Sequence, residues 1–289
     1  MLLQRLIKYL IITVWLVAMG WLVRYEAFPH WFEDTIQGYR TLTRDLPAVR
    51  DSWMKVLLDG QHVGYSNSTI EMEEVDGQED LIMRSQLFLH IHMGSRIEHL
   101  RLTSRVNVRN GQDLMSFNVG FQLSEYIGEV KAVRVENNDF DLEMRLIPFM
   151  GDARMQRRIQ ISDQAIISGP LLDAGLRNLR PGQELRMRAM DPFSVTGELQ
   201  EILLRGEGPD TIQTSDGETH HLHRVSMRSG DIVVQAWLTD TGQTIRQETP
   251  FGLVLESATV HQAVQVPDQN AVRLSQLLAS PNIPGIPGL

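Results

Sequence analysis

The sequence contains no cysteine, and this absence removes several kinds of chemistry at once. Without a thiol, the chain can form no disulfide scaffold, no thiolate zinc site, no iron–sulfur cluster and no cysteine nucleophile. Basic residues are also scarce, because 27 Lys and Arg stand against 36 Asp and Glu and leave a net charge of -9. This charge disfavours general nucleic-acid binding, so we expect no nucleic-acid partner.

Common catalytic signatures are missing as well. The chain has no G-x-x-x-x-G-K-[ST] phosphate loop, no Rossmann glycine run and no G-x-S-x-G nucleophile elbow. The remaining composition, with 42% hydrophobic and 22% charged residues, is typical of an ordinary folded protein of one or two domains. We therefore expect a protein that is not an enzyme.

A long hydrophobic run lies at the N-terminus. Leu6–Val23 has 18 residues with Lys8 as the only charge, and as a helix it spans about 27 Å, enough to cross a bilayer. Arg5 and Lys8 at its start predict a cytoplasmic N-terminus. The sequence thus predicts a transmembrane anchor over residues 1–24.

A cleaved signal peptide is the alternative to this anchor. Its best pair of small residues, Ala18 and Gly20, is followed by bulky Trp21, which makes a poor cleavage site. Positive charge at the far end of the run is limited to Arg24, which Glu26 follows, so the rest of the chain should be translocated. We expect a single-pass protein of the inner membrane, with that membrane as a partner and most of the chain in the periplasm.

Residues 25–48 are predicted to form a juxtamembrane stalk. Within Pro29–Leu46, apolar side chains recur at helical spacing, which predicts a short amphipathic helix near the membrane. These side chains are Trp31, Phe32, Ile36, Tyr39 and Leu42.

The pattern changes over residues 49–262 to short alternating runs, separated by turn residues such as Asp59-Gly60 and Asn110-Gly111. This alternation predicts a periplasmic β-domain. Its fold class is mainly β, with a large curved antiparallel sheet that forms a half-barrel or a sandwich and is accompanied by a short helix.

The short helix is predicted within Gly169–Gly182, where leucines precede an Arg-Pro-Gly stop. A domain boundary within 165–182 stays open. The tail, residues 263–289, is rich in Pro and Gly toward its end and is expected to be largely disordered.

One hairpin can be registered residue by residue. Apolar and polar residues alternate in Leu81–Met93 and in Arg96–Val108. Gly94-Ser95 between them suits a two-residue type II′ turn, because glycine occupies the first position. A slip by one residue would place leucines opposite charges, so the pattern specifies the register.

This register creates an apolar face that is the candidate ligand-binding surface. It places Leu89 opposite Leu100 and Leu87 opposite Leu102. Such a face either lines a cavity for an acyl chain or fills a core. Methionines at strand positions would suit the same lining, although core packing is the alternative. They are Met83, Met93, Met115, Met144, Met187 and Met227.

The opposite face of the hairpin carries a candidate metal site. The register places His90 across from His99, with His92 two residues along on the same face. Three imidazoles in this arrangement suit a tetrahedral zinc ion with one position open for water. The alternative is a solvated polar face, because Arg, Gln and Thr recur beside the histidines. No other cofactor is expected.

A second hairpin is predicted at Ser229-Gly230, where the turn would pair Met227 with Ile232. The strand before it carries another candidate metal cluster, for which semi-buried core or sheet edge is the alternative. This cluster consists of His220, His221 and His223.

Four segments resemble bacterial envelope β-domains, including those that precede transglutaminase-like domains. The segment Trp53–Tyr65 (WMKVLLDGQHVGY) is similar to their opening hairpin, and Ala236–Glu256 (AWLTDTGQTIRQETPFGLVLE) to their closing hairpin. Leu179–Gly182 (LRPG) and Asp191–Ser194 (DPFS) resemble their middle segment. The resemblance implies a large sheet akin to periplasmic lipoprotein-carrier folds. It carries over no catalytic residue, because transglutaminase chemistry needs a cysteine nucleophile.

Taken together, these patterns predict a membrane-anchored, non-catalytic binding or scaffold module of the cell envelope that handles lipid or lipoprotein. One alternative is a protein–protein adaptor for a membrane complex, whose sheet edge recruits a strand of the partner. The other is a zinc-dependent enzyme built on the three histidines of the first hairpin.

Overall fold

A computed structural model describes residues 34–35, 38–39, 49–75, 77–147, 153–163, 165–167, 179–190 and 199–273. The chain divides into two compact units, Met1–Thr35 and Ile36–Leu289. In the first unit, only the two-residue strand β1 (Asp34–Thr35) is described. The predicted anchor lies outside the described residues. Within the described part of the chain, no helix is both long enough and apolar enough to cross a membrane.

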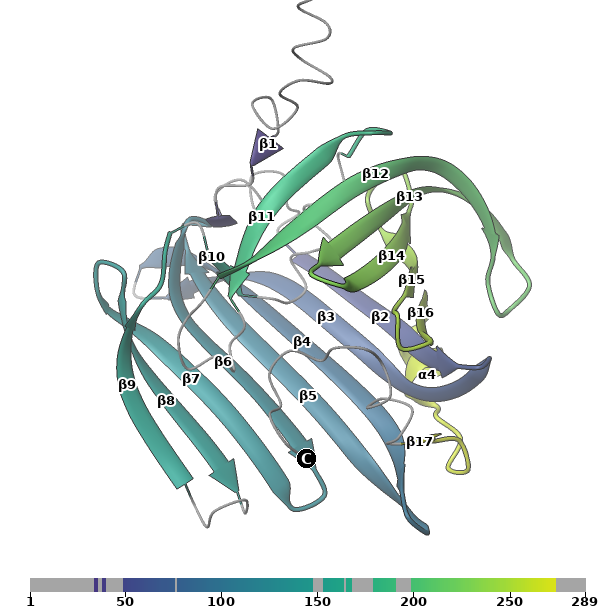
Figure 1. The fold of residues 1–289 in the computed structure, drawn as a ribbon, viewed down its shortest axis with the longest axis horizontal. Coiled ribbons are helices and arrows are strands. Elements are labelled where there is room, and N and C mark those ends of the chain that lie inside the picture. The colour runs from purple at the N-terminus through teal and green to yellow at the C-terminus, as the bar shows by residue number, and fades with distance from the viewer. Residues whose placement is uncertain are drawn as a thin grey trace, which may run out of the picture. The chain divides into compact units, whose positions relative to one another are not determined.

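The second unit is built almost entirely of strands (Figure 1). They are β2 (Val49–Leu58), β3 (Gln61–Val75), β4 (Gln78–Met93), β5 (Arg96–Arg109), β6 (Asp113–Leu123), β7 (Tyr126–Glu136), β8 (Asp139–Ile147), β9 (Ala153–Gln160), β10 (Ala165–Ile167), β11 (Glu184–Met190), β12 (Leu199–Gln213), β13 (Thr219–Ser229), β14 (Ile232–Leu238), β15 (Thr244–Glu248), β16 (Leu253–Ser257) and β17 (Val272–Arg273). A short helix, α4 (Val260–Val264), precedes β17.

These strands form one large, open sheet. Antiparallel pairing runs in chain order from β11 to β16, passes from β16 to β2, and continues in chain order to β9. Two pairs are parallel, β10 with β11 and β17 with β4. The predicted mainly β fold with a large antiparallel sheet is confirmed. Residues 169–178 of the predicted helix lie outside the described part of the chain.

The predicted β4–β5 hairpin is confirmed in every pair, including Leu89 with Leu100 and Leu87 with Leu102. Gly94 has a φ of 65°, whereas Ser95 stays outside the left-handed region, as a type II′ turn requires. The local pattern of alternation and turn residues was therefore sufficient to define this hairpin.

The predicted register of the β13–β14 hairpin is wrong by two residues. Ser229 pairs with Ile232, and Met227 pairs with Val234 rather than Ile232. The turn is therefore Gly230-Asp231, and Gly230 supplies the positive φ of 57° at its first position. Because the shift is an even number of residues, every side chain stays on its predicted face.

The main core combines side chains from both ends of the sheet. Buried residues of β3 to β9, such as Phe117 and Phe140, belong to the same cluster as Met187 of β11 and Leu204 of β12. The two arms of the sheet, β3–β9 and β10–β14, thus bury apolar surface together.

Tyr39, from the predicted stalk, is buried in this main core. Its hydroxyl oxygen accepts a hydrogen bond of 2.9 Å from the backbone N–H of Ile167. Burial raises the pKa of the phenol well above its usual range, so Tyr39 remains neutral. At this residue, the stalk segment is part of the β-domain.

A second core lies where β2, β3, β4 and β16 meet. It contains Val56, Leu89, Ile91 and Leu253, and Val272 of β17 completes it. The segment 263–289, for which we expect disorder, therefore begins with ordered residues. Its part from 274 onward lies outside the described residues.

Candidate functional site

One face of the sheet, here called the polar face, is lined with charged, amide and aromatic side chains. Directly paired residues of neighbouring strands point to the same face, so the registers define continuous rows across the sheet. The central row of the polar face is Arg224, Trp237, Arg246, Glu256, Lys55, Tyr65, Phe88, Arg101 and Gln122. The next row is Trp53, Asn67, Gln86, Thr103, Gly120 and Glu129.

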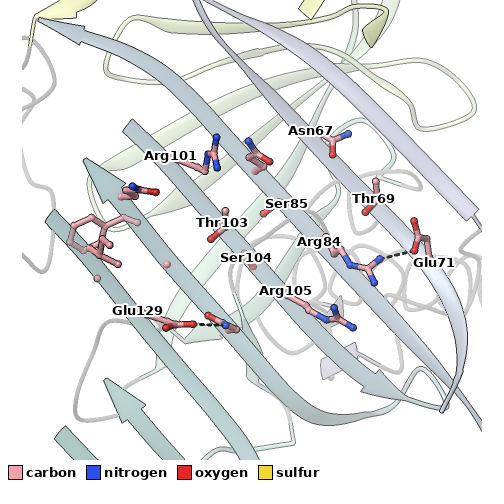
Figure 2. A pocket seen from close by; sticks show the side chains of 17 residues that line it. Asn67, Thr69, Glu71, Arg84, Ser85, Arg101, Thr103, Ser104, Arg105 and Glu129 are labelled. Carbon is pink, nitrogen blue, oxygen red and sulfur yellow. Dashed lines mark hydrogen bonds and ion pairs between the residues drawn. The ribbon is translucent and has the colours of Figure 1, made fainter. Parts of the chain in front are cut away.

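Where β3 to β7 cross it, the polar face carries an open hollow of about 650 Å³, here called the polar hollow (Figure 2). Its lining comes mostly from the even-numbered side chains of β4 and β6 and the odd-numbered ones of β3, β5 and β7. It consists of Asn67, Thr69, Glu71, Arg84, Ser85, Gln86, Arg101, Thr103, Ser104, Arg105, Asn118, Gly120, Phe121, Gln122, Ile127, Gly128 and Glu129. Hydrogen-bonding groups therefore predominate in the hollow.

The three arginines of the polar hollow differ in their partners. Arg84 binds Glu71 at 2.6 Å and Glu73 at 2.5 Å, and these contacts raise the pKa of its guanidinium. Arg105 reaches a carboxylate, that of Glu73, only at 3.8 Å. Arg101 has no ion pair or hydrogen bond from its side chain to any residue that the structure describes. Figure 2 shows Arg101 apart from the Arg84–Glu71 pair, and its five donors are available to a ligand.

A continuous strip of rings borders the polar hollow. Ring centroids lie 5.9 Å apart between Trp53 and Tyr65, 5.2 Å between Tyr65 and Phe88, and 5.3 Å between Phe88 and His99. These spacings are those of interacting aromatic side chains. The strip runs from β2 to β5 and ends at exposed His99.

A buried carboxylate, Glu256, lies within the central row, between Arg246 and Lys55. Its side chain is 1% exposed and contacts Lys55 Nζ at 3.4 Å and Arg246 Nη1 at 3.0 Å. The backbone N–H of Ser215, in the turn between β12 and β13, donates to it at 3.0 Å. Because both cations and an N–H satisfy the carboxylate, this cluster serves the structure of the sheet.

The predicted apolar face is partly filled. Leu89 is buried in the second core, and Leu87 and Leu100 pack against it. Leu102, by contrast, is 36% exposed. Among the predicted methionines, Met83 and Met187 are fully buried in the main core, so they pack there and line no open cavity.

The structure brings two of the three predicted zinc ligands together. The rings of His90 and His99 have centroids 4.9 Å apart. His92 lies two residues along β4 on the same face as His90, as the register predicts, and its paired positions are Ile97 of β5 and Arg273 of β17. In the part of the chain that the structure describes, no group of three metal-binding side chains occurs.

The histidines around β13 form separate polar contacts. His221 Nδ1 lies 2.9 Å from Thr211 Oγ1, and His223 Nε2 lies 2.9 Å from Asp240 Oδ1. His220 Nε2 lies 3.6 Å from Glu218. Each imidazole thus has its own neighbour.

Sequence reasoning identified the polar side of the β4–β5 hairpin but not the hollow. The alternation of Arg84 and Gln86 with apolar residues already indicated that side. The alternation within one hairpin does not show how that hairpin pairs with β3, β6 and β7. This pairing adds Asn67, Asn118 and Gln122 to the lining of the hollow. Only the assembled sheet makes these side chains neighbours.

Comparisons with known proteins add one structural likeness. No family model matches the chain, and no curated protein matches it. The chain is similar to a solved structure of a beta-barrel-like protein of the domain of unknown function DUF1849 from Brucella abortus. That alignment covers 72% of this chain and 94% of the other, with 8% sequence identity and a TM-score of 0.39. The predicted relation to domains that precede transglutaminase-like domains stays a prediction.

Proposed function

We propose that this protein is a non-catalytic binding module of the cell envelope that engages its partner through the polar hollow of β3–β7. In this proposal, the N-terminal segment anchors the chain in the inner membrane and the β-domain stands in the periplasm. The observation that carries the proposal is the hollow itself, an open surface of hydrogen-bonding groups drawn from five neighbouring strands.

The character of the two faces supports this choice. The inner, apolar side of the sheet is occupied by two packed cores, which leaves little of it for a ligand. The polar face instead offers Arg101, which makes no ion pair with any described residue, and Arg105, whose contact with the Glu73 carboxylate is as long as 3.8 Å. A guanidinium that lacks an internal partner is a ready donor for an external acceptor.

A photo-crosslinking experiment tests the proposal. A photoreactive residue replaces Thr103, at the centre of the hollow, in the full chain expressed in cells. We expect a crosslinked product that is lost when Arg101→Glu is added. The matched control carries the same photoreactive residue at Arg228, an exposed position of β13 outside the hollow.

Two results would contradict the proposal. One is the absence of any product from position Thr103 in a chain whose far-UV circular dichroism shows that it is folded. The other is the same set of products from Thr103 and Arg228, which would indicate nonspecific contact.

A second candidate, lipid handling, draws support from Leu102. This leucine is 36% exposed beside the half-buried Leu87 and Leu100, between the two cores. Native mass spectrometry of the full chain tests it. We expect a lipid mass that is lost in Leu102→Asp and retained in Val135→Asp, a control at an exposed valine. An added zinc mass that disappears in His90→Ala would instead support the zinc enzyme.

A further inference from the structure

The polar hollow and its border bring together hydrogen-bonding side chains and aromatic rings. Few classes of ligand can use both. Amides and hydroxyls line the hollow. The Nδ2 of Asn67 donates to Asp51 at 2.7 Å and the Nε2 of Gln86 donates to the Tyr65 hydroxyl at 3.3 Å, which leaves the amide oxygens as acceptors beside the Thr103 hydroxyl. Directly beside them, the ring strip of Trp53, Tyr65 and Phe88 adds half-buried aromatic side chains that contact one another and contribute apolar surface. A ligand that matches both must have polar groups around its rim and an apolar face.

Sugars have this combination. Each pyranose ring carries hydroxyls at its edge and C–H groups on its faces, so amides can bind the former while aromatic side chains pack against the latter. A simple acyl chain would desolvate the remaining amide oxygens and hydroxyls of the hollow without offering them a hydrogen bond, which is unfavourable. The chemistry of the surface therefore favours a glycan over a lipid.

A polypeptide strand fits the polar hollow less well. Peptides that bind sheets do so through backbone hydrogen bonds to an edge strand. The hollow instead lies on the face of β3–β7, where the backbone groups are already paired between neighbouring strands. A ligand of the hollow must therefore be recognised by the side chains of β3–β7, through polar and apolar groups other than a peptide backbone.

The arginines add a preference for negative charge. Arg101 and Arg105 flank Thr103 on the same face of β5, and successive same-face residues of a strand are about 7 Å apart. The two carboxylates of the hollow are both occupied, because Glu71 binds Arg84 and Glu129 accepts a hydrogen bond of 2.8 Å from Asn118. Arg101 therefore remains for a carboxylate of a ligand, and Arg105, which contacts Glu73 only at 3.8 Å, is placed to bind a second one.

We propose that the polar hollow binds an oligosaccharide that carries carboxylate groups, with the ring strip packed against sugar faces and Arg101 and Arg105 bound to the carboxylates. This inference rests on the proposed binding function and specifies the class of its ligand. It assigns the amide oxygens of β3, β4 and β6 to the sugar hydroxyls, because the N–H groups of Asn67, Gln86 and Asn118 already donate within the protein.

Isothermal titration calorimetry of the full chain with three probes tests this inference. Hexagalacturonate carries sugars and carboxylates, maltohexaose carries sugars alone, and hexaglutamate carries carboxylates on a peptide. We expect hexagalacturonate to bind most tightly, maltohexaose more weakly and hexaglutamate not measurably.

Variants separate the contributions of the two surfaces. Arg101→Gln should weaken hexagalacturonate binding about tenfold, the loss expected for one charge-assisted contact, and leave maltohexaose binding unchanged. Phe88→Leu should weaken the binding of both sugars. Arg228→Gln, on the exposed part of β13, is the control and should change neither.

Three outcomes would overturn the inference. They are failure of both sugars to bind at millimolar concentration, equal binding of hexaglutamate and hexagalacturonate, and an effect of Arg228→Gln as large as that of Arg101→Gln. A crosslink to a protein at Thr103, combined with no sugar binding, would reject the glycan and keep the proposed binding module. The absence of any crosslinked product from Thr103 in a folded chain, combined with no sugar binding, would reject both.

Discussion

At the scale of single residues, Glu256 places a carboxylate where water barely reaches. Lys55, Arg246 and the N–H of Ser215 all contact it, and these partners come from β2, β15 and the β12–β13 turn; Arg246 also pairs with Glu248 at 2.7 Å. Removing one member of a buried charged cluster leaves the others without compensation. Glu256 therefore stabilises three separate elements through one side chain.

We predict that Glu256→Ala lowers the free energy of unfolding by about 3 kcal/mol, as expected when a buried ion pair loses one partner. Urea denaturation of the full chain measures the change. The matched control is Glu201→Ala, because Glu201 pairs with Arg186 at 3.2 Å but is 57% exposed. There the loss should stay below about 1 kcal/mol. Equal losses in the two variants would show that burial of Glu256 is not what matters.

At the scale of elements, residues 258–273 form a C-terminal segment, here called the clip, that contains α4 and β17. Hydrogen bonds that involve two histidines and an asparagine hold the clip against the sheet. The side-chain amide of Asn270 donates to the carbonyl oxygen of His62 at 3.1 Å. The carbonyl oxygen of Asn270 lies 3.2 Å from Nδ1 of buried His90. The ring of His62 lies 2.9 Å from the Gly64 carbonyl oxygen, and Val272 pairs in parallel with Ile91 of β4.

The clip should be sensitive to acid. Burial lowers the pKa of His62 below its ordinary value and outweighs its backbone hydrogen bonds with Gly64 and Ala263, which raise the pKa; the positive charge of Lys55 lowers it further. The unfolded chain therefore takes up this proton at a higher pH than the folded chain does. Stability contributed by neutral His62 is present above the ordinary histidine pKa and is lost as the pH falls through the lowered value.

We predict that acidification from about pH 7 to about pH 5 lowers the melting temperature of the wild-type chain, with a smaller decrease in His62→Gln. Hydrogen exchange should show that amides of β17 and of the end of β4 lose protection first. His261→Gln is the control, because His261 is exposed on α4 and should leave the pH dependence as in wild type. An unchanged pH dependence in His62→Gln would refute the assignment.

At the scale of the described β-domain, the main core joins strands that are far apart in the chain. Phe117 of β6 and Ala236 of β14 belong to the same buried cluster. A sheet whose two arms share one core should lose both arms together, because neither arm covers its apolar side alone.

We predict that Phe117→Ala lowers the free energy of unfolding by about 3–5 kcal/mol and shifts both arms of the sheet equally. Hydrogen exchange with mass spectrometry in increasing urea should give one midpoint for peptides of β5–β6 and peptides of β12–β14. Val135→Ala, at a valine that is 52% exposed, should leave that midpoint unchanged. Two separate midpoints would show that the arms are independent units.

Local sequence was enough where the structure depends on neighbours in the chain. Gly94-Ser95 and the alternation around it defined every pair of the β4–β5 hairpin. The observed register of the β13–β14 hairpin differs from the predicted register by two residues. Gly230 can occupy either the first or the second position of a two-residue turn, so the local sequence allows both registers. Only the first arrangement, with Asp231, occurs.

The alternation of apolar and polar residues was enough to assign side chains to a face, because the period of a strand is two and an even shift of register preserves it. What each face contacts depends on how distant strands assemble. Leu89 is buried with Val272, a residue far along the chain, whereas Leu102, on the same face of the hairpin, is exposed. Arg84 pairs with acids of β3, whereas Arg101, on the adjacent strand, is available. Both outcomes depend on contacts between distant segments, and periodicity within one segment carries no information about those contacts.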